Sequence, residues 1–124
     1  MVGRIAEATG AKKVGRRVGP SIDVRSASGL KIDITCRAEP IIQASSSDPS
    51  PSAAYYRDLS TAGGIAIDVP PATVEAALVR AYETALRERR KSFIQQSGWS
   101  ASCYADPGSS SLRTLCSVGR IPPG

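Results

Sequence analysis

The strongest pattern in the sequence is the run PATVEAALVRAYETALRERRKSFIQQ at residues 71–96. Its apolar side chains recur at helical spacing, and the stripe includes Val74, Leu78, Tyr82 and Phe93. Proline is favourable in the first turn of a helix, and strong helix formers follow it. We predict one long amphipathic helix over 71–96. The basic side chains of its C-terminal half suit the negative end of the helix dipole, which gives them a structural role ahead of an RNA-binding one.

Two stretches before this helix alternate with period two and predict strands. Residues 21–26 (SIDVRS) and 30–37 (LKIDITCR) each place apolar side chains on one face and polar ones on the other. The residues between them form a turn, so the pair is typical of a hairpin with one covered side. A further extended stretch is predicted over 54–69, with a bulge or bend at its glycine pair, residues 63–64.

Three other segments complete the layout. Residues 43–53 lack apolar anchors and carry two prolines, which predicts a long exposed loop. Residues 1–19 are basic and punctuated by glycine, which predicts an arm or an edge strand. Residues 99–118 contain two extended stretches joined by a turn, which predicts a closing hairpin.

The three cysteines do not form a disulfide framework. If the closing hairpin turns near Gly108 and Ser109, Cys103 faces Cys116 and a cross-strand disulfide is geometrically allowed. The alternative is two reduced, partly buried thiols, which we favour for a protein made in a cytoplasm. Cys36 lies in an apolar alternation and is interpreted as a small core residue. Without histidine or a CxxC pair, we predict no metal site and no cofactor.

Length and composition bound the class of protein. A chain of 124 residues predicts a single domain over 1–124, and an aromatic content of 5% leaves Ala, Val and Ile to build the core. A net charge of +5 favours an anionic partner, with nucleic acid ahead of a membrane surface. No apolar run is long enough to span a bilayer and no signal-peptide pattern opens the sequence, so we expect no membrane partner. Because histidine is absent, the Ser-His-Asp and Cys-His systems are excluded, and with them most familiar hydrolase designs. This does not exclude every enzyme, although our expectation is that the protein is not one.

The order of elements predicts an α+β fold, with an antiparallel β-sheet and the long amphipathic helix packed on its apolar face. One helix is too small to cover such a sheet. We therefore expect an intertwined dimer in which each helix lies over both sheets.

This layout resembles the coat proteins of small single-stranded RNA bacteriophages. The matching parts are the hairpin 21–37, the loop 43–53, the strand 54–69 and the run ATVEAALVRAYETALR at 72–87. Most such coats begin with an extra N-terminal hairpin, whereas here a hairpin follows the helix. The chain is thus more similar to a permuted subgroup, in which C-terminal strands fill the place of the missing N-terminal strand.

The resemblance implies a function in binding and assembly. The protein would form a homodimer, self-assemble into an icosahedral shell in the host cytoplasm, and bind the genomic RNA on the inward sheet face of the virion. The implied RNA contacts are Arg25, Lys31, Thr35 and Arg37, with Arg57 alongside and Tyr56 stacked on an unpaired base. The helix stripe Val74, Leu78, Tyr82 and Phe93 would pack in the dimer. For Arg25 and Lys31 the alternative is a solvated sheet face with cross-strand pairing to Asp23 and Asp33.

Three other functions compete with this reading. A head–tail joining subunit of a phage would use the same arm, loop and helix. A small basic ribonuclease would need Lys31, Arg37, Glu39 and Tyr56 close together. A nucleic-acid-binding regulator would use residues 4–18, although glycine interrupts a recognition helix there.

Overall fold

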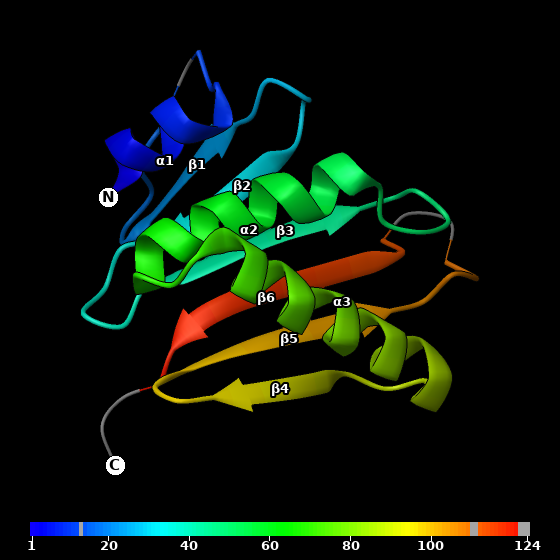
Figure 1. Ribbon diagram of the computed structural model, residues 1–124. Helices are drawn as coiled ribbons and strands as arrows, with labels where there is room; N and C mark the ends of the chain where they lie inside the picture. Colours follow the sequence, from blue (N-terminus) through cyan, green and yellow to red (C-terminus); the bar gives the residue numbers. More distant parts are fainter. Residues whose placement is uncertain (13, 110–111, 122–124) are drawn as a thin grey trace.

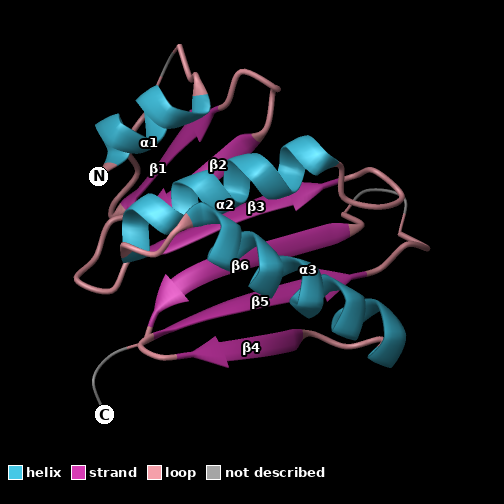
Figure 2. Ribbon diagram, viewed as in Figure 1, coloured by secondary structure: helices cyan, strands magenta, loops and turns pink. Residues whose placement is uncertain are grey.

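The computed structural model describes residues 1–12, 14–109 and 112–121 (Figure 1). This part of the chain forms three helices on one face of a six-stranded antiparallel sheet (Figure 2), which confirms the predicted α+β class. The strand order is β1-β2-β3-β6-β5-β4. The elements are α1 (Val2–Thr9), β1 (Ser21–Arg25), β2 (Lys31–Thr35), β3 (Ile41–Ser46), α2 (Ala53–Ile67), α3 (Pro71–Glu88), β4 (Ser92–Gln96), β5 (Trp99–Ala105) and β6 (Thr114–Arg120).

The sheet consists of two three-stranded meanders, β1–β2–β3 and β4–β5–β6, that pair through β3 and β6. Between them the chain crosses one face of the sheet: α2 contacts β3 and β6, and α3 contacts β5 and β4 (Figure 1). The core lies between these helices and the sheet, and Ala, Val and Ile supply most of its buried apolar residues, as predicted. We call the pairing of β3 with β6 the seam.

The strands predicted from period-two alternation are confirmed. Residues 21–26 and 30–37 contain β1 and β2, and the apolar members Val24, Ile32 and Ile34 are fully buried. The hairpin predicted over 99–118 corresponds to β5 and β6, although its residues 110 and 111 lie outside the described part.

The extended stretch predicted over 54–69 is wrong, because these residues form α2. Buried side chains recur at Tyr55, Leu59, Ala62 and Ile67, which is helical and not strand spacing. The helix begins at a capping residue that the sequence reading missed: the side chain of Ser52 accepts a hydrogen bond from the Tyr55 N–H at 3.1 Å.

The glycine pair within α2 allows close packing and does not mark a bulge. A Cβ atom on Gly63 would lie 3.2 Å from the Val118 side chain, so glycine lets α2 approach β6. A Cβ atom on Gly64 would lie 2.6 Å from the carbonyl oxygen of Val69, so the chain can turn back sharply into α3. Both glycines reduce helix propensity, and for this reason the helix was not predicted from the sequence.

The predicted loop 43–53 is also only partly correct. Its first residues belong to β3, a central strand that pairs with β2 and β6. Ile42 and Ala44 face the helices and are fully buried, while Gln43 and Ser45 face away from them. The polar residues made this strand resemble a loop, because one face of the sheet is not covered. The loop itself spans 47–52.

The long helix predicted over 71–96 ends early, at Glu88. Arg89 then adopts a left-handed conformation, and residues 92–96 form β4. Gln96 pairs with Trp99, so the pair at 97–98 is the tight turn of a hairpin and not a helix stop. The stripe is confirmed for Val74, Leu78 and Tyr82, which are buried on α3.

The prediction for Phe93, the fourth member of that stripe, is wrong. It lies on β4 and is 64% exposed, because the helix that was expected to carry it has already ended.

The arm or edge strand predicted for 1–19 is partly correct: residues 14–18 lie along the edge strand β1, but residues 2–9 form a helix. Helix α1 buries Ile5, Ala6 and Thr9 and ends at Gly10, whose φ of 72° is left-handed. Residues 14–18 then follow β1 through isolated bridges. The propensity penalty of the glycines made this short helix invisible to the sequence reading.

One chain covers its own sheet with three described helices, so the size argument for an intertwined dimer does not apply. Among the described residues no single helix is long and apolar enough to cross a membrane. Helices α2 and α3 meet that length and composition only as a pair, bent by 119°.

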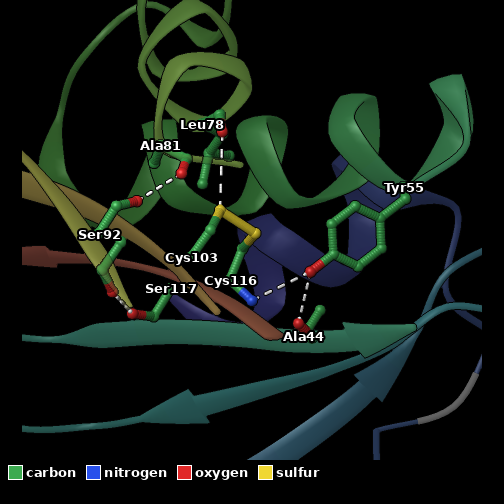
Figure 3. The surroundings of a disulfide bond; sticks show 9 residues. Ala44, Tyr55, Leu78, Ala81, Ser92, Cys103, Cys116 and Ser117 are labelled. Atoms are coloured by element: carbon green, nitrogen blue, oxygen red, sulfur yellow. Dashed lines mark hydrogen bonds between the residues drawn. A yellow bond between two sulfur atoms is a disulfide. The ribbon is translucent and has the colours of Figure 1, made fainter. Parts of the chain in front are cut away.

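The register predicted for the cysteines is confirmed. Cys103 lies directly opposite Cys116, their Cα atoms are 4.1 Å apart, and a disulfide joins them (Figure 3). Both side chains are fully buried, which corrects the preference for partly buried thiols. The Tyr55 hydroxyl donates to the Ala44 carbonyl oxygen at 2.6 Å and accepts from the Cys116 N–H at 3.2 Å, so it spans the seam beside the disulfide. Burial raises the pKa of this phenol well above its usual range.

Candidate functional site

The side of the sheet that points away from the helices is what we call the open face. Alternate residues of a strand point to opposite sides, so the pairing register fixes its members. On the first meander they include Asp23, Arg25, Lys31, Asp33, Thr35, Gln43 and Ser45; on the second they include Phe93, Gln95, Ser100, Ser102, Tyr104, Leu115 and Ser117. Most of these side chains are polar. The face is broad and suits an extended ligand.

Two predicted RNA-binding residues lie together at the β1–β2 end of the open face. Arg25 is directly opposite Lys31, and in the next pair on the same face Asp23 is opposite Asp33. The Lys31 Nζ lies 4.0 Å from an Asp33 carboxylate oxygen, which is an ion pair along β2 and not the cross-strand pairing of the alternative. The four charges cancel. Exposed ion pairs of this kind contribute about 0–1 kcal/mol, so an external anion can replace the carboxylate at little cost.

A cavity of about 350 Å³ opens beside these two cations. Its lining includes Arg25 and Lys31 and a group of side-chain hydroxyls: Ser28, Ser45, Ser46, Ser47 and Ser52. Hydroxyls and cations are the groups that most often contact phosphate and sugar oxygens of a nucleic acid. The carboxylate of Asp48 also lines the cavity and opposes anion binding there.

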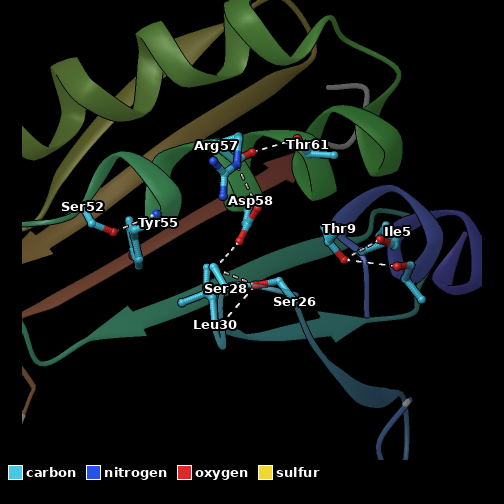
Figure 4. A network of polar contacts seen from close by, with 11 residues as sticks. Ile5, Thr9, Ser26, Ser28, Leu30, Ser52, Tyr55, Arg57, Asp58 and Thr61 are labelled. Carbon is cyan, nitrogen blue, oxygen red and sulfur yellow. Dashed lines mark hydrogen bonds and ion pairs between the residues drawn. The ribbon is translucent and has the colours of Figure 1, made fainter. Parts of the chain in front are cut away.

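A polar network fixes the turn that carries Arg25 and Lys31 (Figure 4). The buried carboxylate of Asp58, on α2, accepts a hydrogen bond from the Ser28 hydroxyl at 2.6 Å. Ser28 and Ser26 share a hydrogen bond of 2.9 Å, and the guanidinium of Arg25 donates to the Gly29 carbonyl oxygen at 2.9 Å. The network anchors the β1–β2 turn to α2, so the two cations project from a fixed backbone. No pattern in the sequence predicted that Asp58 would meet this turn.

The other two predicted contacts from the first hairpin lie at the opposite end of β2. Thr35 is on the open face, where it pairs with Ser21 and Ile41. Arg37 follows the strand in an exposed bend. Both are available to a ligand that runs along β2, but they do not share the cavity beside Lys31.

Tyr56 and Arg57 are not part of the open face, because the segment that carries them is a helix on the other side of the sheet. Tyr56 packs edge-to-face against Tyr55 and Tyr82, with ring centroids 5.9 and 6.5 Å away. Burial, together with nearby phenol and carboxylate groups, raises the pKa of Tyr56 to about 12. Arg57 forms an ion pair with Asp58 at 3.4 Å. The predicted placement of Tyr56 and Arg57 beside the sheet cations is therefore wrong.

The β4–β5 end of the open face carries aromatic residues that the sequence reading did not assign to a site. Phe93 on β4 is opposite Ser102 on β5. Tyr104 lies two residues after Ser102 on β5 and therefore points to the same side of the sheet. The Lys91 ammonium is 5.2 Å from the centre of the Phe93 ring. The period-two pattern of SFIQQ could have indicated this strand. It was overlooked because the strong helical pattern before it was extended over these residues.

The described residues do not gather a catalytic set of the kind that the ribonuclease alternative needs. Lys31 begins β2 and Arg37 follows its end, while Tyr56 lies across the sheet on α2. Within the described ranges no group of three or more acidic, cysteine or histidine side chains is placed to hold a metal ion. No protein-family model matches the chain, and no curated protein or solved structure is significantly similar to it.

Proposed function

We propose that this protein is an RNA-binding structural subunit that assembles with copies of itself, as its resemblance to single-stranded RNA phage coat proteins implies. The observation that carries the proposal is the asymmetry of the sheet. One face is closed by the chain's own helices, while the other presents polar groups on all six strands and two cations, Arg25 and Lys31, at its β1–β2 end. The proposal rests on this open face and not on element order, because residues 54–69 do not form the strand on which the resemblance relied.

In this proposal Arg25, Lys31, Thr35 and Arg37 bind genomic RNA. Cations on a sheet are suited to phosphate contacts, which supply affinity that depends on salt concentration. Because Asp23 and Asp33 neutralise part of the charge, each contact is weak. Many weak contacts are appropriate for a surface that is repeated in every subunit of a shell, since their sum determines binding.

Self-association is supported by a difference between the two edges of the sheet. On β1 the outward backbone groups are occupied: the Gly15 N–H donates to the Asp23 carbonyl oxygen, and Val18 and Ser21 exchange two hydrogen bonds. A Cβ atom on Gly15 would collide with the Asp23 side chain, so glycine is needed for this approach. The β1 edge is therefore protected from pairing with another chain.

The β4 edge lacks such protection in the described part of the chain. The strand contains no charge and no proline. The Cys103–Cys116 pair is close, as in a non-hydrogen-bonded rung, so alternation turns the N–H and C=O groups of Phe93 and Gln95 outward. A second copy can add its own β4 antiparallel to these groups about a twofold axis. The two sheets then become one, and the open face doubles in width.

Assembly of such dimers into a shell that encloses RNA completes the proposal. A phage structural subunit of the head–tail joining type would use the same β4 pairing but form rings. The Cys103–Cys116 disulfide would form after release from the host, since the cytoplasm keeps thiols reduced.

The test is to express the full chain alone in bacteria, separate it by size exclusion, and image the earliest peak by negative-stain electron microscopy with an ultraviolet spectrum. We expect uniform closed shells that absorb as nucleic acid. Gln95→Pro removes one outward N–H and is expected to abolish assembly, whereas Gln95→Ala retains the N–H and assembles. Circular dichroism confirms that both variants fold. A monomer without RNA, or rings in place of shells, would overturn the coat function.

A further inference from the structure

The corner where α3 passes into β4 carries a dense group of cations. We define the basic corner as Arg87, Arg89, Arg90, Lys91, Phe93 and Tyr104. The run 87–91 contains four cations and one acid, Glu88. Glu88 pairs with Arg90 at 3.0 Å. Arg87 and Arg89 form no ion pair with the described residues, so the corner keeps a net positive charge.

Two exposed rings lie next to two of these cations: Phe93 is beside Lys91, and Tyr104 lines a cavity with Arg89. Phe93, on the edge strand β4, is 64% exposed, and Tyr104, on the neighbouring β5, is 37% exposed; both project from the open face. Lys91 already lies over Phe93, which places a positive charge at a ring face. A cavity of about 550 Å³ beside Tyr104 is lined by Leu86, Arg89 and Asp106, whose carboxylate accepts a hydrogen bond from the Tyr104 hydroxyl. Flat apolar surface beside cations is the combination that single-stranded nucleic acids require of a protein.

The backbone at Arg89 is a second observation in favour of a function. Its φ of 54° is left-handed, a conformation in which helices usually end with glycine. A side chain at this position carries a conformational penalty that glycine would remove. Arg89 lines the cavity beside Tyr104, where α3 has ended. Strain of this kind is concentrated at functional positions.

We propose that the basic corner binds single-stranded RNA, with phosphates held by Arg87, Arg89 and Lys91 and an unpaired base stacked on Phe93. The rings favour this partner over a duplex, whose bases are already stacked, and over an anionic lipid surface, which offers no base. The proposal shares the RNA partner of the proposed function but assigns it to another end of the open face. It does not require assembly, because all the groups belong to one chain.

The probe is a fluorescein-labelled 15-nucleotide oligouridine, and its anisotropy is measured against the purified full chain in several salt concentrations. Arg87→Gln/Arg89→Gly is expected to lower affinity at least tenfold and to reduce the salt slope by about 1.4, because two phosphate contacts are lost. Phe93→Leu keeps an apolar side chain but removes the ring, and should weaken binding about 5- to 150-fold. Arg80→Gln, an exposed charge two turns earlier on α3, is the matched control and should change little.

Several outcomes would overturn the proposal. These are unchanged binding by the corner variants, an equal effect of Arg80→Gln, equal affinity for a 15-base-pair RNA duplex, and binding to phosphatidylserine vesicles but not to the oligonucleotide. The variants Arg25→Ala and Lys31→Ala separate the two RNA sites. Shells that package RNA normally with the corner removed would refute this inference and leave the proposed function intact. Binding that depends on the basic corner, in a protein that never assembles, would support this inference and refute the proposed function.

Discussion

Reduction of the Cys103–Cys116 disulfide should strongly destabilise this fold. The bond closes a loop with a sequence separation of 13 residues between the two strands beside the seam. Reduction leaves every side chain in place and adds only two hydrogens. The native contacts of the hairpin are therefore retained, and the main change is the freedom that the unfolded chain gains.

The size of the effect follows from the length of the loop. The entropy lost on closing a loop of about 15 residues is equivalent to about 3 kcal/mol at 25 °C, and the separation of 13 residues gives nearly the same value. At roughly 4 °C per kcal/mol for a domain of this size, the melting temperature should fall by about 12 °C. Because both sulfurs are fully buried, room for two S–H groups must also be found, which adds to the loss.

The assay is urea unfolding followed by the fluorescence of Trp99, the one tryptophan in the sequence. It is run on the oxidised and the reduced protein in a Cys36→Ser background, so that no third thiol can exchange. A thiol count confirms each redox state. The double variant Cys103→Ala/Cys116→Ala should be unaffected by reductant. Equal unfolding midpoints for fully oxidised and fully reduced protein would refute the reasoning, as would a purified, air-oxidised protein that still titrates with all its thiols free.

Other predictions test the packing directly. Gly64→Ala should destabilise the protein by about 1–3 kcal/mol in urea unfolding, although alanine is the better helix former, because its Cβ would lie 2.6 Å from the Val69 carbonyl oxygen; Gly3→Ala meets open space in α1 and should not. The folded-state pKa of Tyr56, about 12, exceeds the unfolded value of 10, so its share of the stability is complete below pH 10 and is lost as the pH rises to about 12. Tyr56→Phe should lessen the loss of stability between pH 9 and 11.5. Arg89→Gly should raise the free energy of unfolding by about 1 kcal/mol, and a decrease would contradict the strain assigned to it.

The parts of the fold that could be predicted are those in which one physical signal acts alone. Strands β1 and β2 alternate strictly because one face is buried and the other is not. The same alternation indicated which side chains share a face with Lys31, and the short closing hairpin fixed Cys103 opposite Cys116. Local pattern was sufficient in each case, since the partner strand is the next one along the chain.

The parts that could not be predicted depend on contacts between distant residues. Gly63 lowers helix propensity within α2, and only the neighbouring Val118 on β6 explains why glycine is there. The end of α3 depends on Ser92, whose hydroxyl donates to the Ala81 carbonyl oxygen and fixes the start of β4. These two errors, the strand predicted over 54–69 and the helix predicted to continue to 96, placed site residues wrongly. Tyr56 moved to the covered side of the sheet and Phe93 moved to the open one.

The open face exists as one surface only through the seam. Its cationic end, with Lys31, belongs to the first meander, and its aromatic end, with Phe93, belongs to the second. The two meanders are joined by β3–β6 hydrogen bonds, by the Tyr55 hydroxyl that contacts both strands, and by the helices that cross over them. The Arg120 guanidinium also donates from β6 to the Ile67 carbonyl oxygen at the end of α2, so the crossover is tied back to the second meander. A ligand long enough to contact both ends therefore binds to a surface whose geometry is set by buried groups on the opposite side of the sheet.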